Sequence, residues 1–518
     1  MSTTYAHTPT EALTTSPRVG WRGWVALAVL MLPVLLVSVD NTVLSFALPQ
    51  ISLHLEPTSA QQLWIIDAYP LVLASLLVTM GTMGDRFGRR KMLLIGAIGF
   101  GVVSILAAFA PSAELLILAR VGLGVFGAML MPSTLSLLRT IFRDREQRRL
   151  AIAIWAAGFS AGMALGPIVG GFLLQHFHWG SVFLLAVPVL IPLLILTPLL
   201  IPESRDPNPG RIDVWSILLS LATMVPLVYG IKSLAVEGIF GPALLLVGLS
   251  VLFGFLFVRR QLRAESPMLD MSLFRHGPFT GAILVNLLSV IALVGFLYFV
   301  AQHLQLILGL SPMDAGLALL PGLAVMILAG LVVVPISRRV APRVLVPAAL
   351  VLSVLGYILV ALTADGGSLV MLIVAFMSLG AGIGMAETVS NELVLSSAPS
   401  AKVGAASAVS ETAYELGAVL GTTIMGGILT AFYRVNLALP AGLPADASDA
   451  ARETLAGAMV AADGLSEPLS SALRDAAAHA FDGGVVITSL IGAALVVVAA
   501  VVAATTLGKS RSTVAAEH

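Results

Sequence analysis

The feature that most constrains this chain is a series of fourteen apolar segments, each long enough to cross a membrane as a helix. A membrane-spanning helix needs about 20 predominantly apolar residues. Hydrophobic residues make up 58% of the 518 residues and charged residues only 11%, which is too little charge to cover a soluble fold of this size. We therefore expect an all-α polytopic membrane protein, and we exclude a cytosolic enzyme, a nucleic-acid binder and a disordered chain. The predicted spans are 24–48, 61–83, 91–110, 114–139, 150–175, 181–201, 213–233, 242–258, 278–304, 314–336, 344–363, 368–394, 403–432 and 483–506.

The basic residues between these spans predict the orientation of the chain. Cytoplasmic loops of membrane proteins are enriched in Lys and Arg. With the N-terminus in the cytoplasm, 23 Lys and Arg residues fall on the cytoplasmic side, 4 fall outside, and Arg120 lies within a span. Both termini are therefore expected in the cytoplasm. Residues 1–20 are rich in Ser and Thr and lack the pattern of a cleaved signal peptide, so the first span should be retained.

A short basic turn between the second and third spans carries the first motif. Its residues are Gly81, Asp85, Arg86, Gly88, Arg89 and Arg90. Gly81 allows two helices to approach closely, and Asp85 can accept hydrogen bonds from the N-terminus of a helix. A similar basic turn follows the tenth span, which indicates a repeated unit interrupted by two additional helices.

The fifth span carries a second motif, made of small residues at intervals of about one turn with one proline. These residues are Gly162, Gly166, Pro167, Gly170 and Gly171. Small residues with this spacing form a groove for a neighbouring helix, and Pro167 should bend its own helix.

Taken together, these motifs resemble those of the major facilitator superfamily. The turn resembles the loop signature of that superfamily, and the fifth span resembles the antiporter motif of its exporters. Arg120 with the glycines that follow it resembles the motif of the fourth helix, and the stretch from Asp40 to Pro49 resembles the first-helix motif of the fourteen-helix drug:proton antiporters. The segment from Ser410 to Gly417 is similar to the quaternary-ammonium and lipophilic-cation efflux pumps within that group.

The resemblance implies a division of the chain. Residues 24–201 and 278–506 would form two six-helix bundles, and 202–277 would hold the two inserted helices 213–233 and 242–258 with their cytoplasmic linkers. Residues 1–23 and 507–518 would be cytoplasmic tails in a bacterial cytoplasmic membrane. Asp85 would dock on the start of span thirteen near residues 402–406 and form part of a cytoplasmic gate. One departure is that spans nine and ten carry no acid at mid-membrane, although some family members have one in span ten.

Three charges fall at similar depths in the N-terminal half. Asp40 lies about 12 Å, and Asp67 and Arg120 each about 9 Å, from the outer ends of their spans. An ionised residue at the centre of a bilayer costs at least ~2.5 kcal/mol, so each needs a reason. One Arg cannot neutralise two carboxylates, so one acid should exchange protons. We expect Asp40 to carry protons and Arg120 to tune it, while Asp67 shares this task or attracts the cation. The alternative is a static Asp–Arg pair.

A further group of acids and aromatic residues is predicted to bind substrate. Glu411, Tyr414 and Glu415 share one face of span thirteen, and an acid beside an aromatic ring suits a lipophilic cation. Glu387 in span twelve is a further candidate, although buried Glu residues can also serve only in helix–helix hydrogen bonds. The aromatic residues expected to line a cavity are Trp64, Tyr69, Trp155, Phe159, Phe296, Tyr298 and Phe299.

The last external loop, residues 433–482, is rich in Ala and has helical apolar spacing at 449–462 and 468–481. We expect a small external helical hairpin that serves as a structural cap or, alternatively, in gating or lipid contact.

These expectations combine into a proton-coupled antiporter that exports lipophilic, mainly cationic drugs by alternating access. The resemblance implies quaternary ammonium compounds, dyes and fluoroquinolones as substrates. We expect no catalytic residue, metal, cofactor, ATP or nucleic acid, and a monomer in the bilayer driven by the proton gradient. The alternatives are an exporter of an endogenous lipid or metabolite with drugs as incidental cargo, and a non-transporting membrane scaffold.

Overall fold

In the computed structural model all regular secondary structure of the described residues is helical. The described residues are 19–205, 213–237, 243–264, 267, 269, 271–363, 368–397 and 403–507. The first half of the chain contains α1 (Trp21–Leu55), α2 (Ser59–Phe87), α3 (Arg89–Ala108), α4 (Ala113–Ile141), α5 (Arg145–His176), α6 (Ser181–Leu184), α7 (Ala186–Leu200), α8 (Val214–Glu237) and α9 (Ala243–Arg263). The second half contains η1 (Leu273–Arg275), α10 (Gly277–Gln302), η2 (His303–Ile307), α11 (Pro312–Ser337), α12 (Pro342–Thr363), α13 (Leu369–Ser397), α14 (Val403–Gly421), η4 (Thr422–Gly426), α15 (Gly427–Asn436), α16 (Ala445–Glu453), α17 (Leu455–Asp463) and α18 (Leu469–Thr506).

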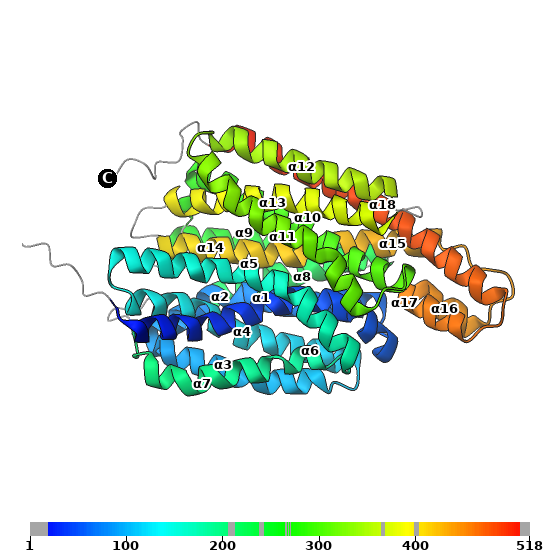
Figure 1. Cartoon of the computed structure of the whole chain (residues 1–518), viewed down its shortest axis with the longest axis horizontal. Coiled ribbons are helices and arrows are strands. Elements are labelled where there is room, and N and C mark those ends of the chain that lie inside the picture. Colours follow the sequence, from blue (N-terminus) through cyan, green and yellow to red (C-terminus); the bar gives the residue numbers. More distant parts are fainter. Residues whose placement is uncertain are drawn as a thin grey trace, which may run out of the picture.

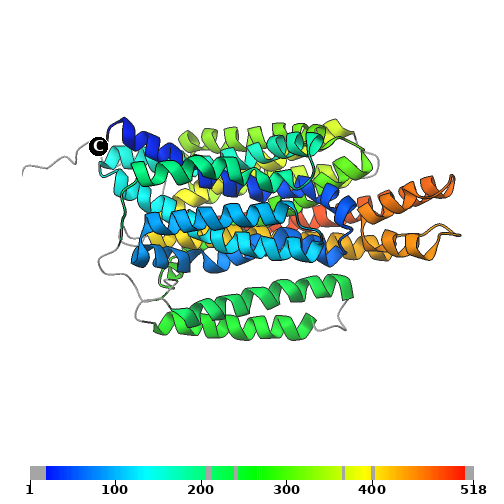
Figure 2. The ribbon, with the colours of Figure 1, turned by 90° about the horizontal axis from the view of Figure 1, so that it is seen from below.

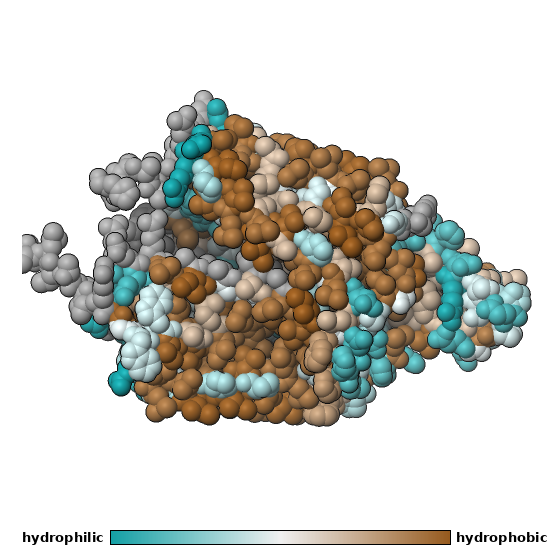
Figure 3. Space-filling model, in the orientation of Figure 1, coloured by the Kyte–Doolittle hydropathy of each residue, from teal (hydrophilic) through white to brown (hydrophobic). Residues whose placement is uncertain are grey.

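The membrane-spanning character predicted from the sequence is confirmed. Among the described residues, thirteen helical segments are long and apolar enough to cross a membrane. The remaining predicted span, 150–175, lies in α5, some of whose side chains are outside the described set. Apolar residues cover the flank of the molecule, and polar residues gather towards the two ends (Figure 3). This surface fits a multi-pass membrane protein, while the orientation of the termini stays a prediction.

The helices form two groups that run roughly parallel to one long axis (Figure 1). In one group α1 packs against α5 and α7, and α2 against α4; in the other α13 packs against α11 and α12, and α12 against α18. The groups meet where α5 contacts α11 and where α2 contacts α14. The helix α1 begins and α18 ends at the same end of the molecule, here called the terminal end; α16 and α17 lie at the opposite end, here called the hairpin end (Figure 1). We refer to the groups as the N-terminal and C-terminal bundles, and their boundaries stay predictions.

Several spans are interrupted, which hydropathy did not predict. The sixth span breaks at Leu185 into α6 and α7. Pro188 explains the break, because its ring clashes with the carbonyl of the residue four positions earlier and its nitrogen carries no hydrogen. Spans nine and thirteen contain π-helical turns, η2 and η4.

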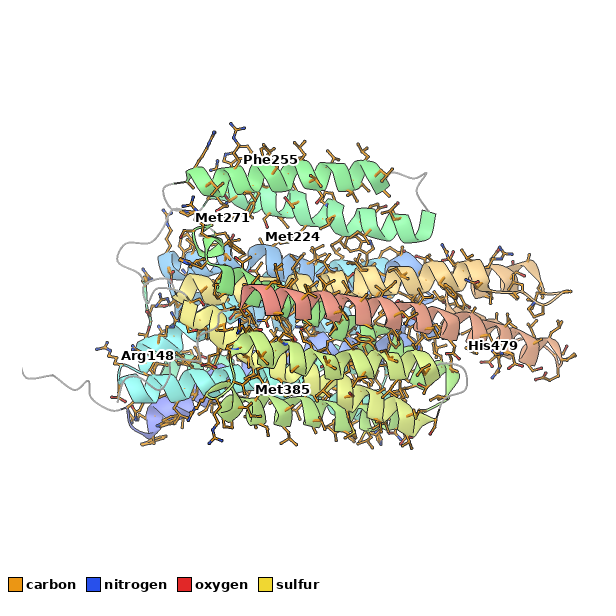
Figure 4. The ribbon with its side chains drawn as sticks, turned by 90° about the horizontal axis from the view of Figure 1, so that it is seen from above. Arg148, Met224, Phe255, Met271, Met385 and His479 are labelled. Atoms are coloured by element: carbon orange, nitrogen blue, oxygen red, sulfur yellow. The ribbon has the colours of Figure 1, made fainter. Side chains whose placement is uncertain are left out.

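The inserted pair α8 and α9 lies along one side of the two bundles (Figure 2). The helix α8 packs against α2 and α15, and Met224 on α8 faces the bundles, where its Sδ lies 3.2 Å from Ser75 Oγ (Figure 4). Phe255 on α9 points away from the bundles and is 62% exposed, as expected for a lipid-facing helix (Figure 4).

The two inserted helices are joined by an ion pair at the terminal end. Arg260 donates from Nη2 to Asp213 Oδ1 at 2.7 Å and from Nε to Oδ2 at 2.9 Å. These hydrogen bonds from Arg260 lower the pKa of Asp213 to about 2. The pair therefore favours the ionised carboxylate.

The hairpin at the opposite end differs from the prediction. The expected helix 449–462 is two helices, α16 and α17, separated at Thr454. Thr454 Oγ1 accepts a hydrogen bond from the backbone N–H of Gly457 at 2.9 Å and so starts a new helix. The expected helix 468–481 is wrong as a separate element, because it continues into the last span as α18. No proline follows Pro468 in the described chain to stop that helix.

Candidate functional site

A buried ion pair lies at the centre of the N-terminal bundle. Arg120 is 1% exposed and donates from Nη1 to Asp40 Oδ2 at 2.6 Å. Its Nε donates to the carbonyl of Ile65 at 3.0 Å, and its Nη2 lies 3.5 Å from the carbonyl of Ile66. Pro70 has no N–H, so the Ile66 carbonyl lacks its normal helical partner and is available to Arg120. Arg120 on α4 thereby ties α1 to α2.

The aromatic ring of Tyr69 completes the surroundings of this guanidinium. The Cζ atom of Arg120 lies 4.6 Å from the ring centroid, which is within cation–π distance. Tyr69 is fully buried. Its ring packs against Arg120, and the predicted role in lining a substrate cavity stays a prediction.

The second acid of the N-terminal bundle makes a contact across the bundle interface. Asp67 is fully buried on α2, and its Oδ2 accepts a hydrogen bond from Thr423 Oγ1 at 2.7 Å. Thr423 belongs to η4 in the C-terminal bundle. Asp40 therefore bonds to Arg120 within its own bundle, and Asp67 bonds to a hydroxyl of the opposite bundle. Thr423 was not identified from the sequence.

The predicted acids of span thirteen face the same interface. Glu415 is 6% exposed, forms a hydrogen bond with the side chain of Asn41 on α1, and interacts electrostatically with Asp40 and Glu411. Glu411, one turn towards the terminal end, interacts with Arg139 on α4. Asn41 was not identified from the sequence, although it directly follows Asp40.

Tyr414 and Glu387 extend this cluster. Tyr414 interacts electrostatically with Glu387 on α13 and with Glu415. The predicted acid–aromatic face of α14 is therefore directed towards neighbouring acids of both bundles. Electrostatic interactions therefore connect Asp40, Glu411, Tyr414, Glu415 and Glu387, and their role in substrate binding stays a prediction.

A small cavity lies between the bundles at this point. Its wall includes Asp40, Asn41 and Arg120 from the N-terminal bundle and Tyr414 and Thr422 from the C-terminal bundle. The volume is about 30 Å³, enough for water. Drug-sized ligands occupy pockets of roughly 300–1,000 Å³. In this conformation the space enclosed by these residues is therefore too small for such a ligand.

Most of the aromatic residues predicted to line a cavity pack elsewhere. Trp155 donates from Nε1 to Thr134 Oγ1 at 3.1 Å inside the N-terminal bundle. Trp64 lies 6.2 Å from Tyr229 of α8, centroid to centroid. Phe296 stacks on Phe376 at 4.9 Å, and the remaining rings are Phe299, which packs edge-on to Phe296, and Tyr298, which is buried on α10. The side chain of Phe159 is outside the described set. A role for these rings in an expanded cavity stays a prediction.

The predicted cytoplasmic gate is a compact hydrogen-bonded turn. Asp85 pairs with Arg89 at 2.8 Å, and Gly88 between α2 and α3 has a φ of +116°, a conformation that favours glycine. The carboxylate of Glu203 accepts from the backbone N–H groups of Arg90 at 3.0 Å and Lys91 at 3.2 Å. This carboxylate occupies the N-terminus of α3, where anions are favoured. Glu203 was not identified from the sequence, although it follows the sixth span on the same predicted side of the membrane.

The remaining gate residues frame this turn. The guanidinium of Arg86 lies 5.9 Å from the ring of Phe87, and Gly81 faces Pro132 of α4. Side-chain Nη1 of Arg90 donates to the carbonyl of Ile201 at 3.1 Å. The expected docking of Asp85 near residues 402–406 involves positions largely outside the described side chains, so it stays a prediction.

The glycines of α5 provide close contacts with both bundles. A Cβ added at Gly166 would lie 1.9 Å from Thr42 Oγ1 of α1. At Gly171 it would lie 2.8 Å from the carbonyl of Pro312, at the start of α11. Gly162 and Gly170 face α1 in the same way, and Pro167 faces Gly316 of α11. The motif thus forms a groove in which α1 and α11 approach α5, as small residues allow.

Comparisons with known proteins agree with this architecture. The model of the Major Facilitator Superfamily matches residues 30–422. The chain is 55% identical over 497 residues to the multidrug efflux pump LfrA of Mycolicibacterium smegmatis, covering 96% of this chain and 98% of that protein. It is 34% identical to the methyl viologen resistance protein SmvA of Salmonella typhimurium, covering 89% and 93% respectively.

A solved structure matches the fold. A bacterial homologue of the human lysosomal transporter Spinster, in an inward-facing and unoccupied conformation, aligns with a TM-score of 0.65 at 19% identity. The alignment covers 94% of this chain and 99% of that structure. This chain belongs to the Major Facilitator Superfamily and is a multi-pass membrane transporter rather than an enzyme.

Proposed function

We propose that this protein is a proton-coupled antiporter that exports lipophilic, mainly cationic drugs from the cytoplasm or inner leaflet. The observation that carries the proposal is the buried Asp40–Arg120 pair on the wall of a cavity shared by both bundles. Ionisable residues inside a membrane protein usually mark ion or substrate pathways. A carboxyl at this position can bind a proton and interact with a site that opens when the bundles move.

The preference for cations is supported by the acids around Tyr414. Glu415, Glu411 and Glu387 interact with one another or with Tyr414 near the bundle interface. A lipophilic cation gains Coulomb attraction from the carboxylates and cation–π contact from the ring. The names of two relatives, a multidrug efflux pump and a resistance protein for the dication methyl viologen, are consistent with such a substrate.

The proposed cycle uses differential affinity for drug and proton. Drug enters while the acids are ionised, and the bundles then rearrange so that the site faces outwards. Protons bind at Asp40, weaken the attraction for the cation and favour its release. The protonated, empty protein returns and releases its protons to the cytoplasm. Drug and proton each shift the equilibrium between the two states, and this coupling is reciprocal for their binding free energies.

The proposal is tested by transport in vesicles that contain the purified protein, with ethidium as the cationic probe and Nile red as an uncharged lipophilic probe. Imposing a proton gradient should drive ethidium transport, and collapsing it with an ionophore should stop transport. Glu411→Gln and Glu415→Gln should reduce ethidium transport more than Nile red transport. Ethidium transport that persists unchanged without a gradient contradicts proton coupling, and equal losses for both probes contradict cation recognition.

A further inference from the structure

The hydrogen bond between Asp67 and Thr423 is a buried polar contact between the two bundles. Both residues are 0% exposed, and the Oγ1–Oδ2 distance is 2.7 Å. They are 356 positions apart in the sequence, so the contact depends on how the bundles sit against each other. Hydrogen bonds to an ionised carboxylate are shorter and stronger than neutral ones, and they gain strength in a low-dielectric interior.

An irregular turn places Thr423 at this contact. Residues Thr422–Gly426 form the π-helical turn η4 between α14 and α15. A π-helical turn inserts an additional residue, and such turns are frequent at functional sites. The turn η4 packs against α2, α8 and α10. At Gly426 an added Cβ would lie 2.7 Å from Leu63 Cδ2 of α2, so a larger residue there would displace that side chain.

The other ionisable groups near Asp67 come from several elements. Tyr298 on α10 interacts with it electrostatically. The turn η4 carries no ionisable side chain. The remaining helices packed against α2 carry ionisable groups that include Asp40 on α1, Arg120 and Glu114 on α4, Tyr414 and Glu415 on α14, and Tyr229 on α8. Those of α3 are Arg89, Arg90 and Lys91, which lie at the other end of α2.

The hydrogen bonds of Arg120 stay within one bundle, unlike the hydrogen bond of Thr423. Its guanidinium is held by Asp40 and by the carbonyls of Ile65 and Ile66, within the N-terminal bundle. The Asp40–Arg120 pair therefore moves with one bundle, whereas the Asp67–Thr423 bond connects two. Separation of α2 from η4 breaks the Asp67–Thr423 hydrogen bond and leaves the Asp40–Arg120 pair intact.

We propose that Thr423 is a positioning residue that couples protonation of Asp67 to separation of the two bundles, an inference that rests on the proposed proton-coupled export. Ionised Asp67 accepts strongly from Thr423 and holds α2 against η4. Protonated Asp67 accepts more weakly, so α2 and η4 separate more readily; in the proposed cycle this favours the outward-facing state in which the drug is released, before the empty protein returns. A proton shifts the equilibrium only through this difference between states. Asp67 therefore connects proton binding to the movement of the bundles, whereas Asp40 lies on the cavity wall.

The test uses three variants of the full-length protein in vesicles, with ethidium as the probe. Thr423→Val keeps the shape of the side chain but removes the hydroxyl, and Thr423→Ser keeps the hydroxyl. Thr197→Val is the matched control, because Thr197 on α7 is 0% exposed and its hydroxyl has no hydrogen-bond partner in the part of the chain that the structure describes. Ethidium affinity of the purified protein, transport rate and the pH dependence of transport are measured for each.

Thr423→Val should lower proton-driven transport about tenfold, in line with the loss of one hydrogen bond to a charged group, and leave ethidium affinity nearly unchanged. Its transport should become half-maximal at a pH about one unit higher, because the ionised carboxylate has lost a donor. Thr423→Ser should restore the wild-type rate and pH profile, and Thr197→Val should match wild type.

The inference is overturned if Thr423→Val keeps the wild-type rate and pH profile, or if Thr423→Ser is as impaired as Thr423→Val, since packing of the methyl group would then explain the defect. These outcomes differ from failure of the proposed function. If wild-type transport is independent of the proton gradient, proton coupling itself is wrong, and the role of Thr423 falls with it.

Discussion

Arg120 and Asp40 form a buried hydrogen-bonded ion pair, with Nη1 and Oδ2 2.6 Å apart. The same guanidinium also donates to the backbone carbonyls of Ile65 and Ile66 on α2, in the turn that precedes Pro70. Arg120 therefore connects the ion pair to the part of α2 in which Pro70 removes a backbone hydrogen bond. Removing either partner leaves a charge in a site that is poorly accessible to water. Removing both leaves no uncompensated charge.

Arg120→Met should therefore destabilise the protein by about 3–5 kcal/mol, the usual effect of breaking a buried pair. The double variant Arg120→Met with Asp40→Asn should recover part of that loss. Chemical unfolding of the purified protein in detergent measures both. A double variant no more stable than Arg120→Met would show that Asp40 is not the partner whose charge matters.

Gly88→Ala should destabilise the turn between α2 and α3. Its φ is +116°, and an added Cβ would lie 2.8 Å from the carboxyl group of Glu203. The expected cost is about 1–3 kcal/mol, typical of a residue forced into a sparsely populated backbone region. Gly101→Ala is the control within the same helix region, because its added Cβ meets only Leu190 at an ordinary 3.6 Å. Equal melting temperatures for the two variants would contradict the account of this turn.

The Asp213–Arg260 pair should make a pH-dependent contribution to stability. Arg260 lowers the pKa of Asp213 to about 2, so the ionised carboxylate stabilises the folded state. This contribution is fully present above the unfolded pKa of about 4 and is lost as the pH falls through about 2. The difference in melting temperature between wild type and Asp213→Asn should shrink across that interval. A difference that stays constant would mean that the carboxylate charge contributes nothing.

The hairpin end should open more readily when Glu453 is removed. Glu453 accepts from Arg434 of α15 at 2.6 Å and lies 3.5 Å from the backbone N–H of Ser59 at the start of α2, so it bridges the two bundles. The chain has no cysteine, so Ser45→Cys on the cavity wall provides a single labelling site. Glu453→Ala should increase its labelling by an impermeant maleimide added at the hairpin end.

Asp463→Ala provides the control for that experiment. Asp463 pairs with Arg474, and both belong to the hairpin end of the C-terminal bundle, α17 and α18. Breaking this pair removes a surface ion pair without breaking a contact between bundles. Labelling that rises equally in both variants would indicate general loosening of the hairpin rather than loss of a bridge.

Hydropathy was sufficient to predict the membrane helices, because a run of apolar residues has only one common explanation at this length. The break at Pro188 was readable in principle from proline chemistry. The π-helical turn η4, which packs against α2 and α10, was not, because residues Thr422–Gly426 include no proline or other residue that marks such a turn. The hairpin prediction failed in part because helical periodicity does not show whether a helix ends or continues, and Thr454 decides this by a side-chain contact.

The candidate site was also predictable only in part. Buried charge is unusual enough that Asp40 and Arg120 could be identified, and the structure pairs them. Thr423, Asn41 and Glu203 could not, because hydroxyl, amide and loop carboxyl groups are common and acquire a role only from what lies opposite. Thr423 bonds to Asp67, Asn41 bonds to Glu415, and Glu203 bonds to the start of α3. Each of these partners is distant in the sequence.

Proton exchange at Asp40 is the central claim, and it is tested most directly by drug-induced proton release. Ethidium is added to purified protein in weakly buffered detergent solution, and the pH change and the ethidium bound are recorded together. Wild type should release protons as ethidium binds, and Asp40→Asn should bind ethidium but release markedly fewer. If Asp40→Asn releases as many protons per bound ethidium as wild type, Asp40 is not the proton carrier and the proposed mechanism is wrong.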